Sequence, residues 1–76
     1  MVEIKAIGVL CFVNDYGSHR WEVWKVEDEC YYFFVMSWNG NMLRYNEKEQ
    51  RIEEKKPGGY WDVFDGCIFQ ADYVRY

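Results

Sequence analysis

The sequence predicts a small, mainly β domain: an antiparallel sheet or barrel of five to six strands. Three observations support this fold class. Apolar and polar residues alternate over short stretches, turn-forming pairs such as Asn-Gly and Asp-Gly separate those stretches, and half of the residues are apolar with 21% aromatic, a composition that suits packed sheets. At 76 residues, the chain is expected to form one domain, 1–76, because a fold of this size has room for a single core.

The first half of the chain is interpreted as three strands. The stretch 2–13 begins with alternation and continues as an apolar run, and the turn-forming residues of 14–18 end it. A half-buried strand follows at 21–26 and stops at the acidic triplet 27–29. The nine residues Cys30 to Trp38 are almost all apolar or aromatic, which predicts the central and most buried strand of the sheet.

A hairpin and an ambiguous polar segment come next. Asn39-Gly40 predicts a type I′ turn, because both residues tolerate positive φ, so 42–45 is expected to return along the preceding strand. The segment 46–56 leaves two alternatives open, since Ile52 is its only apolar residue. It forms either one short solvated helix, which would make the fold α+β, or a polar hairpin.

The last segment predicts a second hairpin with aromatic sides. Pro57-Gly58-Gly59 ends the polar segment, because proline breaks a helix and the glycines permit a sharp reversal. Asp65-Gly66 then separates the aromatic stretches 60–64 and 67–76, which are expected to pair with each other.

Catalytic, metal and cofactor motifs are not found in the sequence. His19 is the only histidine and lies in a predicted polar turn, with no nucleophile-elbow pattern around either serine. Cys11, Cys30 and Cys67 lack the spacing of a zinc site and are interpreted as three free thiols in the core. Nucleotide-binding glycine patterns are also missing. We therefore expect a non-enzymatic protein with no cofactor and no metal.

Hydrophobicity and thiol content predict the compartment. No stretch approaches the roughly 20 apolar residues that a membrane span requires, and the apolar run 6–13 has no basic segment before it. Unpaired thiols are typical of a reducing environment. The expected location is the cytoplasm, without membrane association.

The charge of the chain bears on the kind of partner. With 9 basic and 13 acidic residues the net charge is −4, which disfavours direct nucleic-acid binding, since phosphate contacts by Lys and Arg supply most of that affinity. Sixteen aromatic residues are many for so small an interior, so some are expected on the surface, where Tyr and Trp favour protein contacts. Acids beside them favour a protein partner with a basic surface; the alternative is that the acidity serves only solubility.

The second half of the chain is the predicted contact face. Between Gly58 and Tyr76 three acids alternate with aromatic residues and only Arg75 is basic. The predicted partner-binding residues are Tyr60, Trp61, Asp62, Asp65, Asp72 and Tyr73.

In size, acidity and compactness the chain resembles the small inhibitors of bacterial defence that phages and mobile elements encode, such as anti-CRISPR proteins. The resemblance involves no diagnostic motif and carries over no functional residue. It implies action in a host cytoplasm, by occupying a basic nucleic-acid channel or a face of a partner protein.

The leading hypothesis is therefore a non-enzymatic protein-binding module, of the inhibitor type, that binds a basic face of a nucleic-acid-handling complex. One rival is a small single-stranded nucleic-acid-binding barrel, in which Lys and Arg would flank the exposed aromatic residues. Another is a subunit that forms a homodimer by pairing a sheet edge. An enzyme would require a pocket joining His19 to one of the three cysteines.

Overall fold

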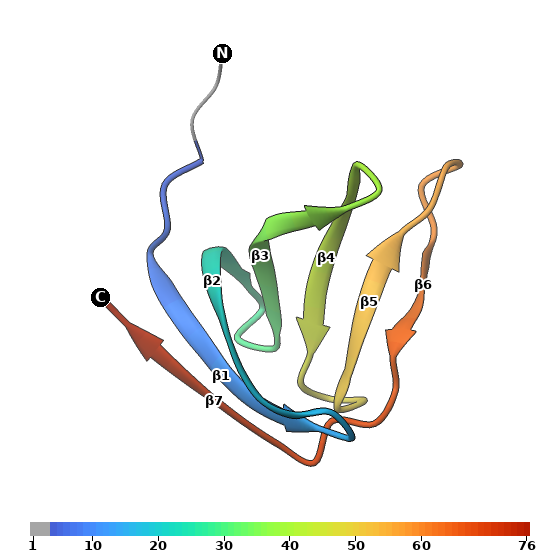
Figure 1. The fold of residues 1–76 in the computed structure, drawn as a ribbon. Helices are drawn as coiled ribbons and strands as arrows, with labels where there is room; N and C mark the ends of the chain where they lie inside the picture. Colours follow the sequence, from blue (N-terminus) through green and yellow to red (C-terminus); the bar gives the residue numbers. More distant parts are fainter. Residues whose placement is uncertain (1–3) are drawn as a thin grey trace.

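Successive hairpins build nearly the whole of this computed structural model, which describes residues 4–76 (Figure 1). The strands form one antiparallel sheet in the order β6-β5-β4-β3-β2-β1-β7. The prediction of a mainly antiparallel β fold is confirmed, but the predicted five to six strands are too few. The seven strands are β1 (Gly8–Asn14), β2 (Gly17–Glu27), β3 (Tyr31–Trp38), β4 (Asn41–Asn46), β5 (Arg51–Lys55), β6 (Trp61–Asp65) and β7 (Gln70–Arg75).

Tight turns connect the first four strands. Asn14 lies opposite Gly17 across the first turn, and Asn39 and Gly40 take φ values of 52° and 77° at the third. These are the positive values that a type I′ turn requires, so the predicted Asn-Gly hairpin is confirmed.

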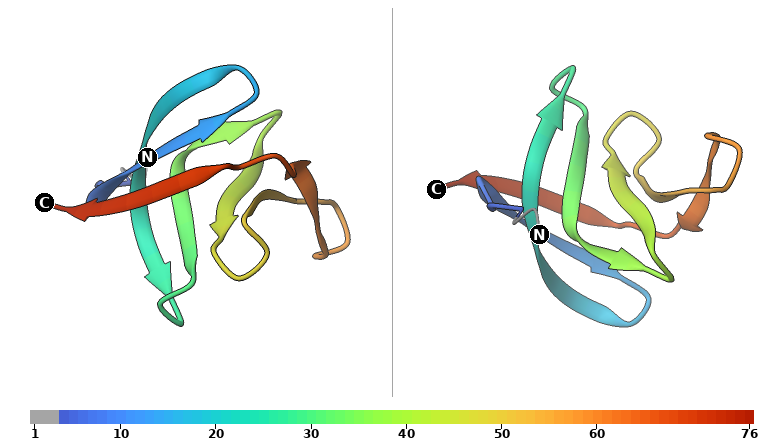
Figure 2. Two further views of the ribbon diagram at one scale, coloured as in Figure 1. Left: turned by 90° about the horizontal axis from the view of Figure 1, so that it is seen from below. Right: turned by 90° about the horizontal axis from the view of Figure 1, so that it is seen from above.

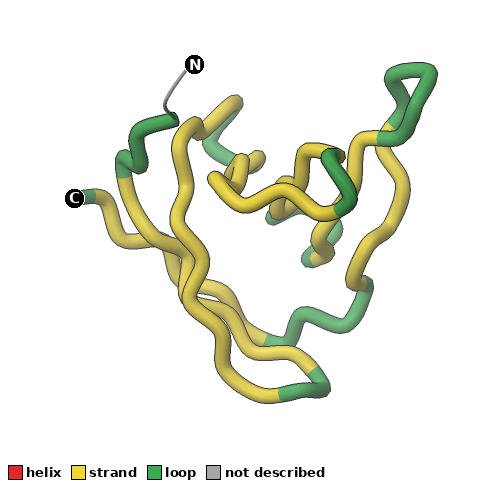
Figure 3. Tube along the Cα trace, turned by 45° about the horizontal axis from the view of Figure 1, so that its top comes forward, coloured by secondary structure: helices red, strands yellow, loops and turns green. Residues whose placement is uncertain are grey.

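The segment 46–56 forms a turn and a strand, and residues 4–76 contain no helix (Figure 3). Its start resembles a helix cap, since the Asn46 side chain accepts hydrogen bonds from the backbone N–H groups of Lys48 and Glu49 at 3.1 and 3.3 Å. At Gln50 the chain reverses with φ of 51°, and β5 then pairs with β4. Ile52 becomes fully buried there, so the polar hairpin is the correct alternative. None of the described residues forms a helix of the length and hydrophobicity that crosses a membrane.

The predicted pairing of 60–64 with 67–76 is wrong. β6 pairs with β5, whereas β7 crosses to the opposite edge and pairs with β1. Neither Asp65 nor Gly66 takes the positive φ of a tight hairpin. Instead the Asp65 carboxylate accepts hydrogen bonds from Asn14 Nδ2 at 2.8 Å and from the backbone N–H of Cys67 at 3.1 Å, which fix the linker between the two edges.

The core lies on the concave face of the curled sheet, with β1 and β7 on one side and β5 and β6 on the other (Figures 1 and 2). Irregular register between β2 and β3 and between β3 and β4 accompanies this curvature. The sheet does not close into a barrel. The buried cluster consists of Leu10, Phe12, Val23, Phe34, Leu43, Tyr45, Ile52 and Ile68.

The sequence predicted that Cys30 to Trp38 would form the central and most buried strand. The strand is central, but it is not the most buried one. In β3 only Phe33 and Phe34 are buried, because its second half extends toward the exposed Asn-Gly turn and leaves Trp38 52% exposed. β1 has four buried residues among seven. Its position between β2 and β7, next to the core, explains the difference.

Candidate functional site

The outer, convex face of the sheet carries aromatic rings gathered around one arginine. We define the outer patch as five residues: Trp24, Tyr31, Phe33, Arg44 and Trp61. Antiparallel register places them together, because directly opposed residues project from the same face. Phe33 lies opposite Arg44 across β3 and β4, and Trp24 occupies the bulge of β2 beside them.

Arg44 lies between two rings of the outer patch. Its Cζ atom is 4.1 Å from the ring centroid of Tyr31 and 4.0 Å from that of Trp61. Phe33 meets Trp61 edge-on at 5.8 Å and lies 6.1 Å from Trp24. Cation–π contacts of this kind contribute roughly 0.5–2 kcal/mol each, so the rings and the guanidinium hold one another in place.

A buried carboxylate fixes the guanidinium from below. Glu53 is only 2% exposed, and it accepts hydrogen bonds from Arg44 Nε and Arg51 Nε, both at 2.8 Å, and from Asn46 Nδ2 at 3.3 Å. Burial by itself raises the pKa of Glu53, but the bonds from Arg44, Arg51 and Asn46 together outweigh it and hold the pKa below its usual value. Glu53 is therefore a charged anchor for the outer patch at neutral pH.

A shallow groove of about 270 Å³ runs beside the outer patch. Besides patch residues, its lining includes Lys25, Lys55 and Glu27. Lys25 Nζ lies 5.1 Å from the Phe33 ring centroid and forms an ion pair with Glu27 at 2.9 Å. Basic residues thus flank these aromatic residues, which is the arrangement that the sequence analysis associated with nucleic-acid binding. Lys25 and Arg44, however, are each already paired with a glutamate.

Two neighbouring acidic turns lie at the Tyr31 end of the outer patch. The β2–β3 turn carries Asp28 and Glu29, the β4–β5 turn carries Glu47 and Glu49, and all four are exposed. The backbone N–H of Glu47 donates to the Cys30 carbonyl at 2.9 Å, and both views in Figure 2 place the two turns at the same end of the molecule.

Charge is distributed unevenly between this face and the rest of the chain. Five basic residues and three acids lie on the outer face of β2 to β5, namely Arg20, Lys25, Arg44, Arg51, Lys55, Glu22, Glu27 and Glu53. Their local balance is +2. Since the whole chain carries −4, its other residues together carry −6.

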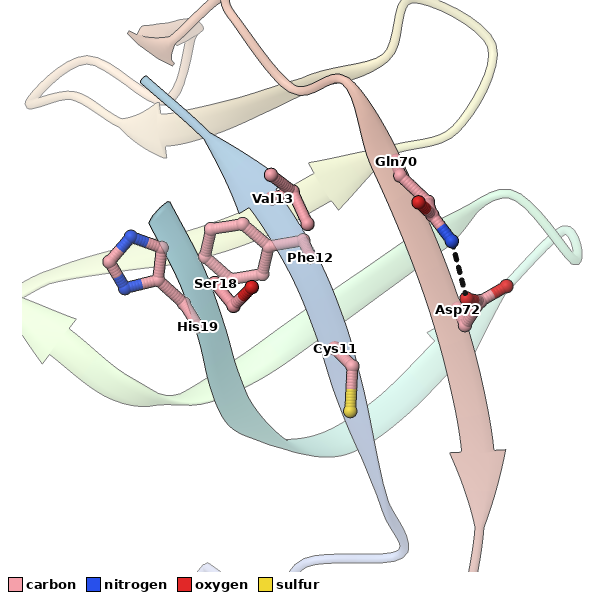
Figure 4. Close-up of a pocket in the computed structure, with 7 residues that line it drawn as sticks. All are labelled: Cys11, Phe12, Val13, Ser18, His19, Gln70 and Asp72. Atoms are coloured by element: carbon pink, nitrogen blue, oxygen red, sulfur yellow. Dashed lines mark hydrogen bonds between the residues drawn. The ribbon is translucent and has the colours of Figure 1, made fainter. Parts of the chain in front are cut away.

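Cys11 and His19 both line a second groove (Figure 4). Its volume is about 130 Å³. Phe12 lies opposite His19 and Cys11 opposite Arg20, so strand alternation sends the cysteine and histidine side chains to opposite faces of the sheet.

His19 also differs from its predicted place. It lies in β2, where the sequence indicated an exposed turn residue. Its Nε2 atom is hydrogen-bonded to Asn14 Oδ1 at 2.8 Å, and its ring stacks on Phe12 with centroids 5.1 Å apart. Both contacts are structural, so this groove does not present a nucleophile and base in contact.

The cysteines differ in their surroundings. Cys30 is buried, as expected of a core thiol, whereas Cys11 is half-buried and Cys67 is exposed. The prediction of three core thiols is therefore wrong for Cys67, because the linker that holds it does not form the predicted hairpin. The carboxylate of Asp15 raises the pKa of the Cys67 thiol, which reduces its thiolate fraction at neutral pH. Within residues 4–76 no cluster of three or more His, Cys, Asp or Glu residues is arranged to hold a metal ion.

The six predicted contact residues are spread over the two edge strands. Trp61 belongs to the outer patch, and Tyr60 precedes it in an exposed turn. Asp62 is exposed and accepts a hydrogen bond from the adjacent Val63 N–H at 2.9 Å. Asp65 fixes the linker between β6 and β7, as described above.

The remaining two residues lie on β7. Asp72 is exposed and accepts a hydrogen bond from Gln70 Nε2 at 3.4 Å. Tyr73 points toward the concave face, where its ring lies 5.0 Å from that of Tyr32. The structure thus brings only Trp61 of the six into the outer patch.

Sequence reasoning missed Arg44 and Glu53. The signal was present in the alternation of 42–45 and 51–55, where every second residue faces outward once the two stretches pair. The sequence does not decide between a helix and a hairpin for 46–56, and Arg44 and Glu53 face each other only in the hairpin. No protein-family model, curated protein or solved structure matches this chain.

Proposed function

We propose that the protein is a non-enzymatic protein-binding module that contacts its partner through the outer patch. The observation that carries this proposal is the Arg44 guanidinium, stacked between Tyr31 and Trp61 and anchored by Glu53. Trp, Tyr and Arg are the residue types that most often dominate the binding energy of protein interfaces. All strands of residues 4–76 belong to this one sheet, so no second sheet and no helix among the described residues packs on its outer face.

Preorganisation makes these residues suited to binding. Ordering a flexible side chain at an interface costs roughly 0.5–1.5 kcal/mol. Stacking and the buried carboxylate already restrict Arg44, whose side chain is 14% exposed. Less conformational entropy is therefore lost when a partner binds.

The acidic turns supply the second part of the proposed surface. Asp28, Glu29, Glu47 and Glu49 are exposed beside the outer patch, and they complement a basic area on the partner. Complexes that handle nucleic acid have such basic areas. We therefore propose that the protein acts as an inhibitor that binds a complex of this kind. Opposite charges would accelerate association and make it salt-dependent.

Affinity capture with matched variants tests this function. The tagged protein is used to recover binding proteins from a lysate of its native source, alongside Arg44→Lys and a control, Tyr16→Ala. Arg44→Lys keeps the charge but removes the planar stacking group, and we expect recovery of specific partners to fall about tenfold. Tyr16 is 90% exposed on the first turn, so its truncation should leave recovery unchanged.

The folded state is verified first by the urea midpoint of each variant. Equal recovery by the wild type and Arg44→Lys, with both folded, would show that the outer patch is not the contact surface.

A second candidate function is single-stranded nucleic-acid binding, favoured by Lys25 and Lys55 beside the rings. The guanidinium already covers one face of both Tyr31 and Trp61, which reduces the ring surface available to bases. Titration with a fluorescent twelve-residue oligothymidylate at two salt concentrations tests it. Saturable binding that weakens steeply with salt would support this candidate over the first.

A further inference from the structure

We propose that the groove beside the outer patch binds a carboxylate-bearing, partly apolar segment of the protein partner. This inference rests on the proposed function and names the chemistry of the group that the groove receives. It is carried by the bonding of Arg44, by the surroundings of Lys55 and by the aromatic walls of the groove.

Arg44 is held in place but is not saturated. Within residues 4–76 its guanidinium forms a hydrogen bond through Nε, to Glu53, and its terminal amino groups donate to no acceptor there. Arg44 lines the groove, so these donors stand at its surface in a fixed plane. A fixed guanidinium with free N–H groups matches the planar geometry of a carboxylate.

Lys55 adds a second cation to the same groove. It is exposed, lies opposite Trp61 in the register of β5 and β6, and has no carboxylate within 4 Å among the described residues. Lys25 also lines the groove, and its side chain is 46% exposed despite the ion pair with Glu27. Charge complementarity therefore favours an anionic occupant.

The apolar residues of the groove indicate that its occupant is partly apolar. Trp24, Phe33, Met42 and Trp61 line the groove between the cations, and its volume of about 270 Å³ lies below the usual 300–1,000 Å³ of small-molecule sites. The groove suits part of an extended peptide, with one acidic side chain beside an apolar one.

A nucleic-acid strand fits these observations less well. Its affinity depends on the number of phosphates that cations neutralise, and two of the three groove cations are already paired with glutamates. The residues outside the outer face carry −6 in total and repel a long polyanion. A short acidic segment within a protein avoids most of that repulsion, and basic partner residues beside it would face the acidic turns, which fixes its orientation.

The tryptophan side chains provide the assay. Trp21, Trp24, Trp38 and Trp61 each give one indole N–H signal in a nitrogen-15 correlation spectrum, and only Trp24 and Trp61 line the groove. The first probe is an eight-residue peptide of alternating Glu and Phe, and the second replaces each Glu by Gln. We expect the acidic peptide to shift the Trp24 and Trp61 signals and to bind about tenfold more tightly than the Gln peptide.

Two charge reversals locate the effect. Lys55→Glu should weaken acidic-peptide binding by about tenfold, whereas Arg75→Glu changes the net charge equally at an exposed position of β7, the opposite edge strand, and should change binding less than about twofold. Both substitutions lie at exposed positions, so the fold should be retained.

Three results would overturn the inference. They are equal affinity for the Glu and Gln peptides, equal weakening by the two reversals, and an oligothymidylate that shifts the groove signals at lower concentration than the acidic peptide does. If the peptide fails while Arg44→Lys still lowers partner capture, the groove chemistry is wrong and the binding function stands.

Discussion

Replacing Gly8 by alanine tests how the open side of the sheet is packed. An ideal Cβ built on Gly8 would lie 2.6 Å from the Tyr73 Oη atom and 2.7 Å from its Cε1 and Cζ atoms. Unstrained carbon contacts are about 3.5–4.0 Å, so the added methyl group overlaps the ring by roughly 1 Å. The Tyr32 ring packs at a tilt against the Tyr73 ring, with centroids 5.0 Å apart, and limits how far the Tyr73 ring can move away.

The expected loss of stability follows from two opposing terms. Overpacking a well-packed site costs about 1–3 kcal/mol. Gly8 does not have a positive φ, so alanine can adopt its backbone conformation and recovers about 0.4–1 kcal/mol through the unfolded chain. We expect Gly8→Ala to lower the free energy of unfolding by about 1–2 kcal/mol, and the Tm by about 5–15 °C.

A double-mutant cycle in urea separates this clash from a general loss of stability. Wild type, Gly8→Ala, Tyr73→Ala and the double variant are unfolded while tryptophan fluorescence is recorded. Once the ring is removed, the extra methyl group has space, so Gly8→Ala should be neutral or slightly stabilising in the Tyr73→Ala background. An equal loss in both backgrounds, within about 0.3 kcal/mol, would refute the proposed packing of Tyr73 over Gly8.

Three further predictions use the same unfolding measurement. Tyr73→Phe removes a buried hydroxyl that has no hydrogen-bond partner among the described residues, so it should raise the free energy of unfolding by about 1 kcal/mol; a loss would show that the hydroxyl is satisfied. Glu53→Gln should cost about 2 kcal/mol at pH 7. Because the native pKa of Glu53 is depressed, that stabilisation is complete above the unfolded value of about 4.3 and is lost as the pH falls through the native value. A difference between Glu53→Gln and wild type that does not shrink at all as the pH is lowered from 7 toward 2 would contradict the ion-pair account. Asp65→Ala should cost about 1–2 kcal/mol, since Asp65 joins β1 to the linker, while Asp62→Ala stays within about 0.5 kcal/mol; equal losses would count against this role.

Local signals predicted the order of the strands in the first half and the Asn39-Gly40 turn, but not all of their bounds. The predicted first strand included residues 4–7 and the predicted turn included 17–20, whereas β1 begins at Gly8 and β2 at Gly17. Alternation and the Asn39-Gly40 pair act through neighbouring residues, because a type I′ turn depends on the positive φ of its own two residues. The same local reasoning failed at Asp65-Gly66. There the Asp65 side chain bonds to Asn14, 51 residues away in the sequence, and that contact replaces the hairpin.

The outer patch depended on a pairing that local signals left open. Arg44 and Glu53 are nine residues apart and meet only when 46–56 forms a hairpin. A segment with one apolar residue has no periodicity strong enough to decide between helix and strand. The burial of Ile52 and the two ion pairs of Glu53 stabilise the strand, and both require the completed sheet.

The sequence by itself determined the antiparallel β class, the first hairpins and the acidity, since alternation, turn residues and charge are properties of neighbouring residues and composition. Only the tertiary structure decided which edge β7 joins, which aromatic residues face outward, and that cations gather beside them in a chain of net charge −4. These features depend on register and on contacts between residues far apart in the chain, where a shift of one residue moves a side chain to the other face of the sheet.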